Sequence, residues 1–240
     1  MPYLVLDIET IGKKYEDFDE TTLGIFKKWA EREAVSEEDA EKSLENIKRG
    51  LPFSPFLGEI VAIGMVDDKD QGAMYFRTDG PVQKEIKDFE EKGIQYRVGS
   101  EKEILERFWE VAKNYNAFVT FNGRGFDAPF LMIRSAVNGI RPSRNLMPNR
   151  YLSSQKYGPQ HIDLADQFTF YGANRRSSLH MSLMAFGIES SKGGEVSGEE
   201  VPQAFSDGKY EEIARYCMDD VFATRKLFEA WNDYLNFETH

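Results

Sequence analysis

The chain has 240 residues, of which 41% are hydrophobic and 13% are aromatic, so it can bury a core and is not a disordered protein. The net charge of −11 argues against tight, static binding to nucleic acid, because passive nucleic-acid-binding proteins are usually basic, but it suits an enzyme that gathers carboxylates around metal ions. No segment has the roughly 20 apolar residues of a membrane helix, so we expect no membrane partner. Cys217 is the one cysteine, which makes a cytoplasmic protein the expectation. The length suits a single domain over residues 1–240.

The first part of the chain is predicted to hold three strands and a long insertion. The strands are expected at 3–8, 59–66 and 73–77. The short turn between the last two indicates an antiparallel hairpin. The insertion, roughly 13–57, is helical in its middle, where Ser36 begins a helix-start pattern, and it ends in an apolar loop broken by prolines at 51–56. It is either an elaborated connection packed on one edge of the fold or a flap over a substrate cleft.

The rest of the chain alternates between helices and strands. Ser100 to Glu103 form a capping box that predicts a helix. The elements expected after it are a strand at 117–121, a helix from about 127 to 137, a short strand at 161–164, a short helix at 178–186, a mobile loop at 190–198 and a final helix from about 209 to 235. Strands that come first and are followed by alternating helices and strands predict a mixed α/β sheet.

Two carboxylates lie two residues apart near the end of the first predicted strand. Asp7 and Glu9 therefore point to the same face of the sheet, because side chains alternate along a strand. Like charges held together are unfavourable unless a cation lies between them, and carboxylate oxygens suit Mg²⁺ or Mn²⁺. A solvated turn gives the same local pattern, so this pair alone is a weak indication of a metal site.

Two further groups of residues repeat this ambiguity. Asp127 opens a predicted helix, where a carboxylate is either a simple cap or a ligand. The preceding glycines, Gly123 and Gly125, permit a close backbone approach to a ligand. In the last helix Tyr216 and Asp220 are four residues apart and share one face. Asp219 lies near the same face and is the alternative to Asp220, and a core tyrosine beside a surface charge is the structural alternative.

Taken together, the three groups resemble the exonuclease motifs of the DnaQ-like, RNase H-like superfamily. The residues that carry the resemblance are, in chain order, Asp7, Glu9, Asn122, Phe126, Asp127, Tyr216 and Asp220. The tyrosine is similar to that of the DEDDy branch, whereas Arg215 stands where the other branch has a histidine. The chain most resembles the stand-alone predicted exonucleases related to the exonuclease domain of family B DNA polymerases.

The resemblance implies an RNase H-like mixed β-sheet with antiparallel leading strands and helices on both faces. The helical insertion after the first strand is the largest feature that does not align with the minimal core of the superfamily. It implies a 3′–5′ exonuclease that hydrolyses single-stranded nucleic acid, DNA favoured, to nucleoside 5′-monophosphates with two divalent cations, Mg²⁺ or Mn²⁺. The catalytic residues that it implies are Asp7, Glu9, Asp127, Tyr216 and Asp220, of which the four carboxylates bind metal, and the implied substrate contacts are Thr10, Asn122 and Phe126. Its partners are single-stranded DNA or RNA 3′ ends and a DNA polymerase or repair protein. An exoribonuclease on the same fold and a non-catalytic nucleic-acid-binding module are the alternatives.

Several other residues allow two interpretations each. Between Arg124 and Arg176 there are eight basic and three acidic residues with aromatic residues among them, which indicates either a single-strand channel or an ordinary core and surface. His161 and His180 are expected to be structural or to contact phosphate. We expect Cys217 to be a small buried apolar residue. Asp163 is expected to cap a helix or to lie at the rim of the site, outside the metal-binding set.

Overall fold

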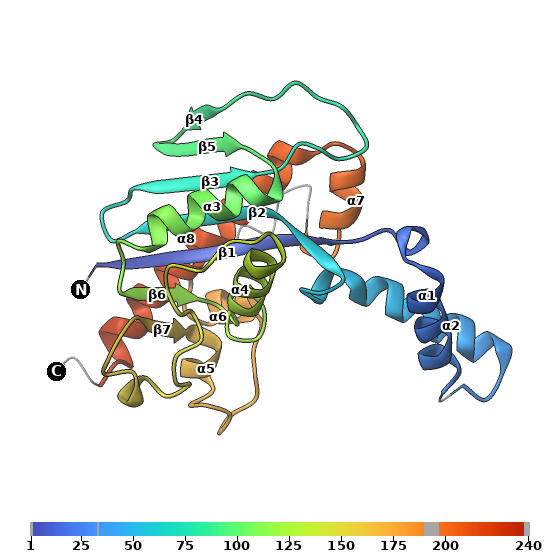
Figure 1. The fold of residues 1–240 in the computed structure, drawn as a ribbon. Helices are drawn as coiled ribbons and strands as arrows, with labels where there is room; N and C mark the ends of the chain where they lie inside the picture. The colour runs from blue at the N-terminus through green and yellow to red at the C-terminus, as the bar shows by residue number, and fades with distance from the viewer. Residues whose placement is uncertain (1, 33, 190–196, 238–240) are drawn as a thin grey trace.

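A computed structural model of the chain describes residues 2–32, 34–189 and 197–237. Within these residues seven strands form one sheet, with helices on both of its faces and a helical arm at one side (Figure 1). The strands are β1 (Tyr3–Gly12), β2 (Gly58–Asp67), β3 (Gly72–Phe76), β4 (Phe89–Glu91), β5 (Ile94–Val98), β6 (Ala117–Thr120) and β7 (Gln160–Asp163). The helices are α1 (Glu20–Glu31), α2 (Glu37–Gly50), α3 (Glu101–Ala112), α4 (Asp127–Val137), α5 (Leu164–Phe168), α6 (Leu179–Ala185), α7 (Val201–Ser206) and α8 (Tyr210–Tyr234), with short 3-10 helices η1 (Tyr15–Asp17), η2 (Leu51–Phe53) and η3 (Leu152–Ser154).

The sheet is mixed, as the sequence predicts. Its strand order is β4-β5-β3-β2-β1-β6-β7. The leading strands β1, β2 and β3 pair in antiparallel fashion, whereas β6 pairs parallel to β1 and β7 pairs parallel to β6. The expected antiparallel leading strands are therefore confirmed, and β1 lies inside the sheet with a neighbour on each side.

Alternation along β1 divides its side chains between two hydrophobic cores. Leu4, Leu6 and Ile8 belong to the core on the side of α3 and α4. Val5 belongs to the core that includes α6, α7 and α8. Because Asp7 and Glu9 have the same parity as Val5, the strand presents both carboxylates to the face that α8 covers.

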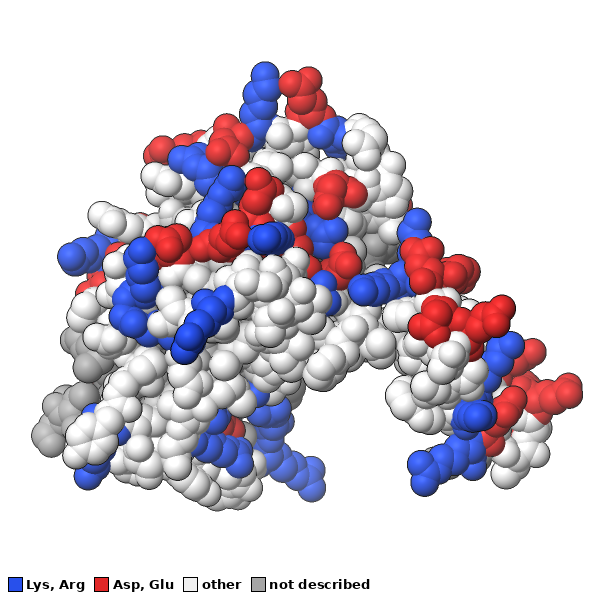
Figure 2. Space-filling view, viewed as in Figure 1, with Lys and Arg blue, Asp and Glu red and all other residues white. Residues whose placement is uncertain are grey.

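The insertion after β1 forms the helical arm. Ser36 caps α2, as expected, because its hydroxyl accepts a hydrogen bond from the Asp39 N–H at 3.2 Å. The arm begins and ends against β1: η2 packs on that strand, and the Thr10 hydroxyl donates to the Pro52 carbonyl at 2.7 Å. Figure 2 shows the arm standing away from the body of the molecule, with an open hollow between the two. Neither predicted description of the insertion is complete, because only its root packs against the sheet.

The other elements agree with the prediction in most places. The strands β4 and β5 have no counterpart in the prediction, because β4 is only three residues long and the Lys92-Gly93 sequence is a weak signal for a hairpin turn. In the structure these two residues form the turn, with φ values of 52° and 80°. The short helix α7 is also unpredicted. Residues 190–196 of the predicted mobile loop lie outside the described residues. No helix in the described part of the chain has the length and apolar character needed to cross a membrane.

Candidate active site

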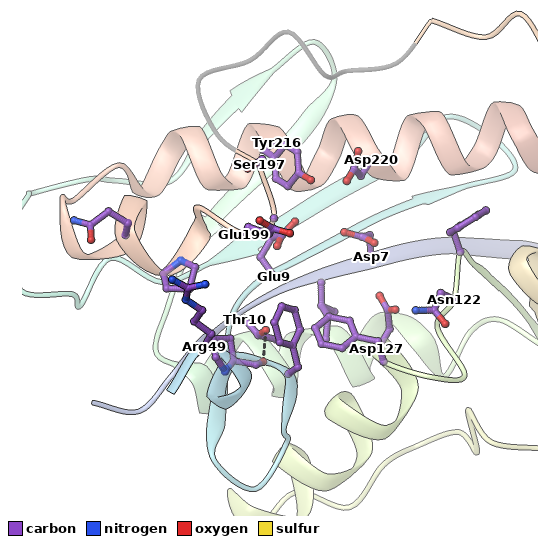
Figure 3. Close-up of a pocket in the computed structure, with 18 of the residues that line it drawn as sticks. Asp7, Glu9, Thr10, Arg49, Asn122, Asp127, Ser197, Glu199, Tyr216 and Asp220 are labelled. Carbon is purple, nitrogen blue, oxygen red and sulfur yellow. Dashed lines mark hydrogen bonds between the residues drawn. The ribbon is translucent and has the colours of Figure 1, made fainter. Parts of the chain in front are cut away.

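A cleft of about 1220 Å³ lies between β1, the N-terminal end of α4, the face of α8 and the root of the arm (Figure 3). Acidic side chains of three separate elements line it, namely Asp7, Glu9, Asp127 and Asp220. The other lining residues are Ile8, Thr10, Lys48, Arg49, Pro52, Phe53, Phe121, Asn122, Phe126, Ser197, Gly198, Glu199, Pro202, Gln203 and Tyr216. All of the site residues that the sequence predicts therefore face one space.

Asp7 and Glu9 are held close to each other and to a thiol. The side chain of Glu9 is 8% exposed, and ligand atoms of Asp7, Glu9 and Cys217 lie within 4.8 Å of one another. Burial raises the pKa of Asp7 well above its ordinary value, and the charges of Asp127, Glu9 and Asp220 raise it further. Burial also raises the pKa of Glu9, with contributions from Asp220 and Asp127. The two carboxyl groups therefore tend to hold protons when no cation is near.

Cys217 is a fully buried residue of α8, as the sequence predicts. Its thiol donates to the Asp7 carbonyl at 3.5 Å and to the Asp7 carboxylate at 3.7 Å. These weak contacts connect the long helix to the strand directly behind the carboxylates. The thiol therefore packs as a small apolar group and also fixes the position of Asp7.

Asp127 is the first residue of α4 rather than its cap. Phe126 occupies the N-cap position and makes no side-chain cap hydrogen bond. The side chain of Asp127 is 2% exposed, and its Oδ1 atom has no hydrogen-bond partner among the described residues. Burial is the main cause that raises the pKa of Asp127 to about 7, and the charge of Asp163 adds to it. The simple-cap interpretation therefore does not describe this residue.

The loop before Asp127 is shaped by its neighbours. Asn122 has a φ of +66°, and a Cβ atom at Gly123 would lie 2.3 Å from the Thr120 hydroxyl oxygen, so only glycine fits there. The Asp163 carboxylate accepts hydrogen bonds from the N–H groups of Asn122 at 2.8 Å and Arg124 at 3.0 Å. Asp163 also caps α5, as expected, by accepting from the Ala165 N–H at 3.0 Å. It thus supports the loop from behind and does not line the cleft.

Tyr216 and Asp220 project from α8 into the cleft, opposite Glu9 and Asp7 in Figure 3. Burial raises the pKa of the Tyr216 hydroxyl far above its ordinary value, and the charges of Asp220, Glu9 and Asp7 raise it further. Asp219 does not line the cleft. Burial raises its pKa, Lys92 of the β4–β5 hairpin lowers it and Glu91 of the same hairpin raises it. The helix therefore turns Asp220, and not Asp219, toward the other carboxylates.

The stretch from Arg124 to Arg176 is mostly structural. None of its eight basic residues lines the cleft. Arg134 forms a buried ion pair with Glu101 at 2.6 Å, and Arg150 pairs with Asp166 at 2.7 Å. The structure therefore places no positive charge of this stretch in the cleft, although several of its aromatic residues are not core either, since Tyr151, Tyr157 and Phe170 are exposed.

His161 is buried and structural. Its Nδ1 atom lies 2.8 Å from the Leu146 carbonyl, which can only accept, so Nδ1 carries the proton and Nε2 accepts from the Thr120 hydroxyl at 2.8 Å. Burial lowers the pKa of His161, which favours this neutral form. Neither His161 nor His180 lines the cleft, and the structural interpretation fits His161.

Two groups of lining residues are absent from the sequence prediction. Lys48, Arg49 and Phe53 belong to the insertion, and Glu199 belongs to the segment before α7. A Cβ atom on Gly198 would lie 3.7 Å from the Tyr216 hydroxyl, so this segment passes close to the tyrosine. The apolar loop 51–56 was the one local signal of such a contact, and it supports the flap interpretation at the root of the insertion.

Comparison with known proteins places the chain in a family. A sequence model described as "Predicted 3'-5' exonuclease related to the exonuclease domain of PolB" matches residues 56–235. The chain belongs to this family. The range of this chain that matches the family model includes Asp127, Tyr216 and Asp220, whereas Asp7 and Glu9 precede it. Asp7 and Glu9 are therefore grouped with the other three residues because all five line the same cleft. The resemblance to exonucleases related to family B polymerases is confirmed.

Two DNA polymerases are similar in sequence to part of this chain. A DNA polymerase of Desulfurococcus sp. (strain Tok) is 30% identical over 149 residues, which are 54% of this chain and 18% of the relative. A DNA polymerase of Thermococcus gorgonarius is 30% identical over 146 residues, with the same two shares of 54% and 18%. The chain thus spans about a fifth of the length of these relatives.

A solved structure shows the fold independently. The structure of the family B DNA polymerase from the hyperthermophilic archaeon Pyrobaculum calidifontis matches with a TM-score of 0.57 and 17% identity over 97% of this chain and 24% of that one. The predicted α/β fold of the RNase H-like kind is confirmed. At this identity the likeness concerns the fold and not the substrate.

Proposed function

We propose that this protein is a metal-dependent exonuclease that removes nucleotides from the 3′ end of single-stranded nucleic acid, with DNA favoured, and releases nucleoside 5′-monophosphates. The observation that carries the proposal is the convergence of four carboxylates, from β1, α4 and α8, on one cleft. Like charges in a buried place are unfavourable unless cations lie between them. Membership of the exonuclease family supports the reaction, and the two DNA polymerase relatives support DNA as the substrate.

The donor atoms fit hard divalent cations such as Mg²⁺ or Mn²⁺, which take oxygen ligands. Asp127 Oδ1 is buried without a hydrogen-bond partner in the described chain. The charges that act most on the pKa values of Asp7 and Glu9 are those of other carboxylates and not of Lys or Arg side chains. Asp7, Glu9 and Asp220 would hold one cation, Asp7 would also hold a second, and Asp127 would bind directly or through water. When bound, the cations lower the pKa of a water molecule and stabilise the charge of the leaving 3′ oxygen.

Tyr216 has a positioning role in this proposal. Its raised pKa keeps the hydroxyl protonated at neutral pH, so the residue is not a general base. A protonated hydroxyl at the mouth of the carboxylate cluster instead donates a hydrogen bond and orients the attacking water. The negative surroundings that raise this pKa also favour the approach of the cations.

Thr10, Asn122 and Phe126 remain the proposed substrate contacts. All three line the cleft, and Figure 3 shows Thr10 and Asn122 at opposite ends of the row of carboxylates. Asn122 lines the cleft, and its Oδ1 has no hydrogen-bond partner among the described residues, so a turn of the side chain toward the cleft would let it accept from a sugar hydroxyl or a base N–H. The Phe126 ring offers a face for stacking.

A separate polymerase or repair protein is the partner that we propose. In the two curated relatives the matched stretch is 18% of a DNA polymerase. This similarity supports a DNA polymerase, or a repair protein that acts with one, as the partner. Co-purification with a tagged form of the chain tests this proposal separately from the catalytic one.

The function is tested with 5′-labelled single-stranded DNA and RNA of one sequence, incubated with Mg²⁺, Mn²⁺ or EDTA. We expect a ladder that shortens from the 3′ end with either cation and no cleavage in EDTA. A faster ladder on DNA supports the DNA preference, whereas a faster ladder on RNA indicates the exoribonuclease alternative. Binding of both polymers without cleavage in any metal would indicate the non-catalytic module.

A further inference from the structure

The cleft is acidic except at the root of the arm, and the inference drawn from this fact rests on the proposed function. The acidic lining residues are Asp7, Glu9, Asp127, Glu199 and Asp220. Among the described residues that line the cleft, positive charge comes from Lys48 and Arg49, adjacent residues in the last turn of α2. A strand whose 3′ end lies among the carboxylates carries further phosphates, which need positive charge close to the metal-binding residues.

Arg49 is the more available of these two cations. Lys48 is engaged by Glu45 at 2.8 Å and lies 5.0 Å from the centre of the Tyr15 ring. Arg49 is exposed and makes none of the hydrogen bonds or ion pairs found among the described residues. Figure 3 shows its side chain reaching up from the arm beside Thr10, at the end of the cleft away from Asn122. Elsewhere the surface of the arm mixes acidic and basic side chains, so this charge is local (Figure 2).

Phe53 supplies an aromatic face next to that charge. Its side chain is 60% exposed, although it is a large apolar residue, and its ring centre lies 6.2 Å from that of Phe126. The ring belongs to η2, whose Leu51 is 4% exposed and whose Pro52 accepts the hydrogen bond from Thr10. An aromatic ring that is already fixed in place loses little conformational entropy when a base stacks on it.

We propose that the root of the arm is the part of the cleft that holds the nucleic acid strand: the Arg49 guanidinium binds a backbone phosphate next to the scissile nucleotide, and Phe53, beside Phe126, stacks on a base. A guanidinium pairs with phosphate oxygens through charge-assisted hydrogen bonds, and base stacking on aromatic rings tolerates any sequence. The helical insertion therefore makes the acidic exonuclease cleft able to hold a polyanion.

The proposal is tested by measuring kcat and KM of single-stranded DNA cleavage in Mn²⁺ over a range of salt concentrations. Arg49→Ala is expected to raise KM by about 10-fold and to lower the slope of log KM against log salt by about 0.7, the value for one phosphate contact on a single strand. Phe53→Ala is expected to raise KM by about 10-fold without a change of slope, as the loss of one stacked base implies. Arg49→Lys, which keeps the charge, restores most of the slope.

Lys27→Ala is the matched control, because it removes one positive charge from α1 of the same arm and does not line the cleft. It is expected to leave KM, kcat and the salt slope as in the wild type, and thermal unfolding is expected to be the same for all variants. Cleavage by the wild type with unchanged KM and slope in Arg49→Ala and Phe53→Ala would overturn the role of the arm and leave the proposed function standing. Absence of cleavage by the wild type would overturn both.

Discussion

Replacing Asp127 by asparagine is expected to stabilise the metal-free protein at alkaline pH. Burial raises the pKa of Asp127 to about 7, whereas an unfolded chain leaves an aspartate near about 3.9. Between these two values the folded state holds a proton that the unfolded state has released. The free energy of unfolding is therefore not reduced by this carboxyl group below about pH 4, where it is protonated in both states. It falls as the pH rises from about 4 and has lost the full contribution once the pH has passed about 7.

The size of the effect follows from the difference of about three pH units between the two pKa values. At about 1.36 kcal/mol for each unit, ionisation of Asp127 costs about 4 kcal/mol of folding free energy near pH 8. For a chain of this length each kcal/mol changes Tm by roughly 2–4 °C, so the asparagine variant is expected to melt roughly 8–16 °C higher in EDTA near pH 8. The raised pKa values of Asp7 and Glu9 also lower the folding stability as the pH rises, both in the wild type and in Asp127→Asn.

The assay is thermal unfolding in EDTA from near pH 5 to near pH 8, for the wild type, Asp127→Asn and Asp233→Asn. Asp233 is an exposed residue of α8 that does not line the cleft, so its variant is expected to follow the wild-type curve. Mn²⁺ is expected to raise the Tm of the wild type near pH 8 by more than that of Asp127→Asn. The reasoning is refuted if Asp127→Asn is no more stable than the wild type near pH 8 in EDTA.

Three other predictions concern single residues. Tyr216→Phe is expected to lower kcat by about 100-fold, as loss of a group that positions water implies, with near-UV circular dichroism and Tm unchanged. Gly123→Ala places a Cβ atom 2.3 Å from the Thr120 hydroxyl oxygen, so about 1–3 kcal/mol of stability and most of the cleavage rate are expected to be lost, as urea titration and the ladder assay would report. Arg134→Met leaves Glu101 buried without its ion pair, so urea titration is expected to show a loss of about 3–5 kcal/mol, while the cleavage rate of the folded fraction stays at the wild-type value.

Regular periodicity made part of the site predictable from the sequence. The two-residue repeat of a strand predicts that Asp7 and Glu9 share one face of β1, and the helical repeat predicts that Tyr216 and Asp220 share one face of α8. Neither prediction requires knowledge of where the strand and the helix lie in the fold. Both patterns are local, so they hold wherever the strand and the helix lie. The order of the three groups then indicated that they converge, and the structure brings them to one cleft. Their catalytic roles stay predictions.

Tertiary contacts determined what the sequence did not predict. Arg49 lies 40 residues after Glu9 in the chain, and it reaches the cleft because η2 docks on β1 through Leu51 and the hydrogen bond of Thr10. No periodic pattern encodes such a contact. The support that Asp163 gives to the loop at Asn122 is of the same kind, since the two residues are 41 positions apart.

Composition was the least reliable guide. The excess of basic residues between Arg124 and Arg176 suggested a nucleic-acid channel, but Arg134 and Arg150 are engaged in ion pairs and none of these residues lines the cleft. Charge counts along a chain do not say which side chains share a surface. The insertion, whose composition is mixed, supplies the positive charge of the cleft instead.

The most direct test of the central claim is the release of the 3′-terminal nucleotide by the wild type and by Asp7→Asn. A single-stranded DNA labelled in its last nucleotide is incubated with each protein in Mn²⁺ and in EDTA, and the labelled products are separated by chromatography. The account predicts that the wild type releases labelled nucleoside 5′-monophosphate in Mn²⁺ and nothing in EDTA, and that Asp7→Asn, although folded, releases none. Full release by Asp7→Asn in Mn²⁺ would contradict the assignment of the carboxylate cluster as the catalytic centre.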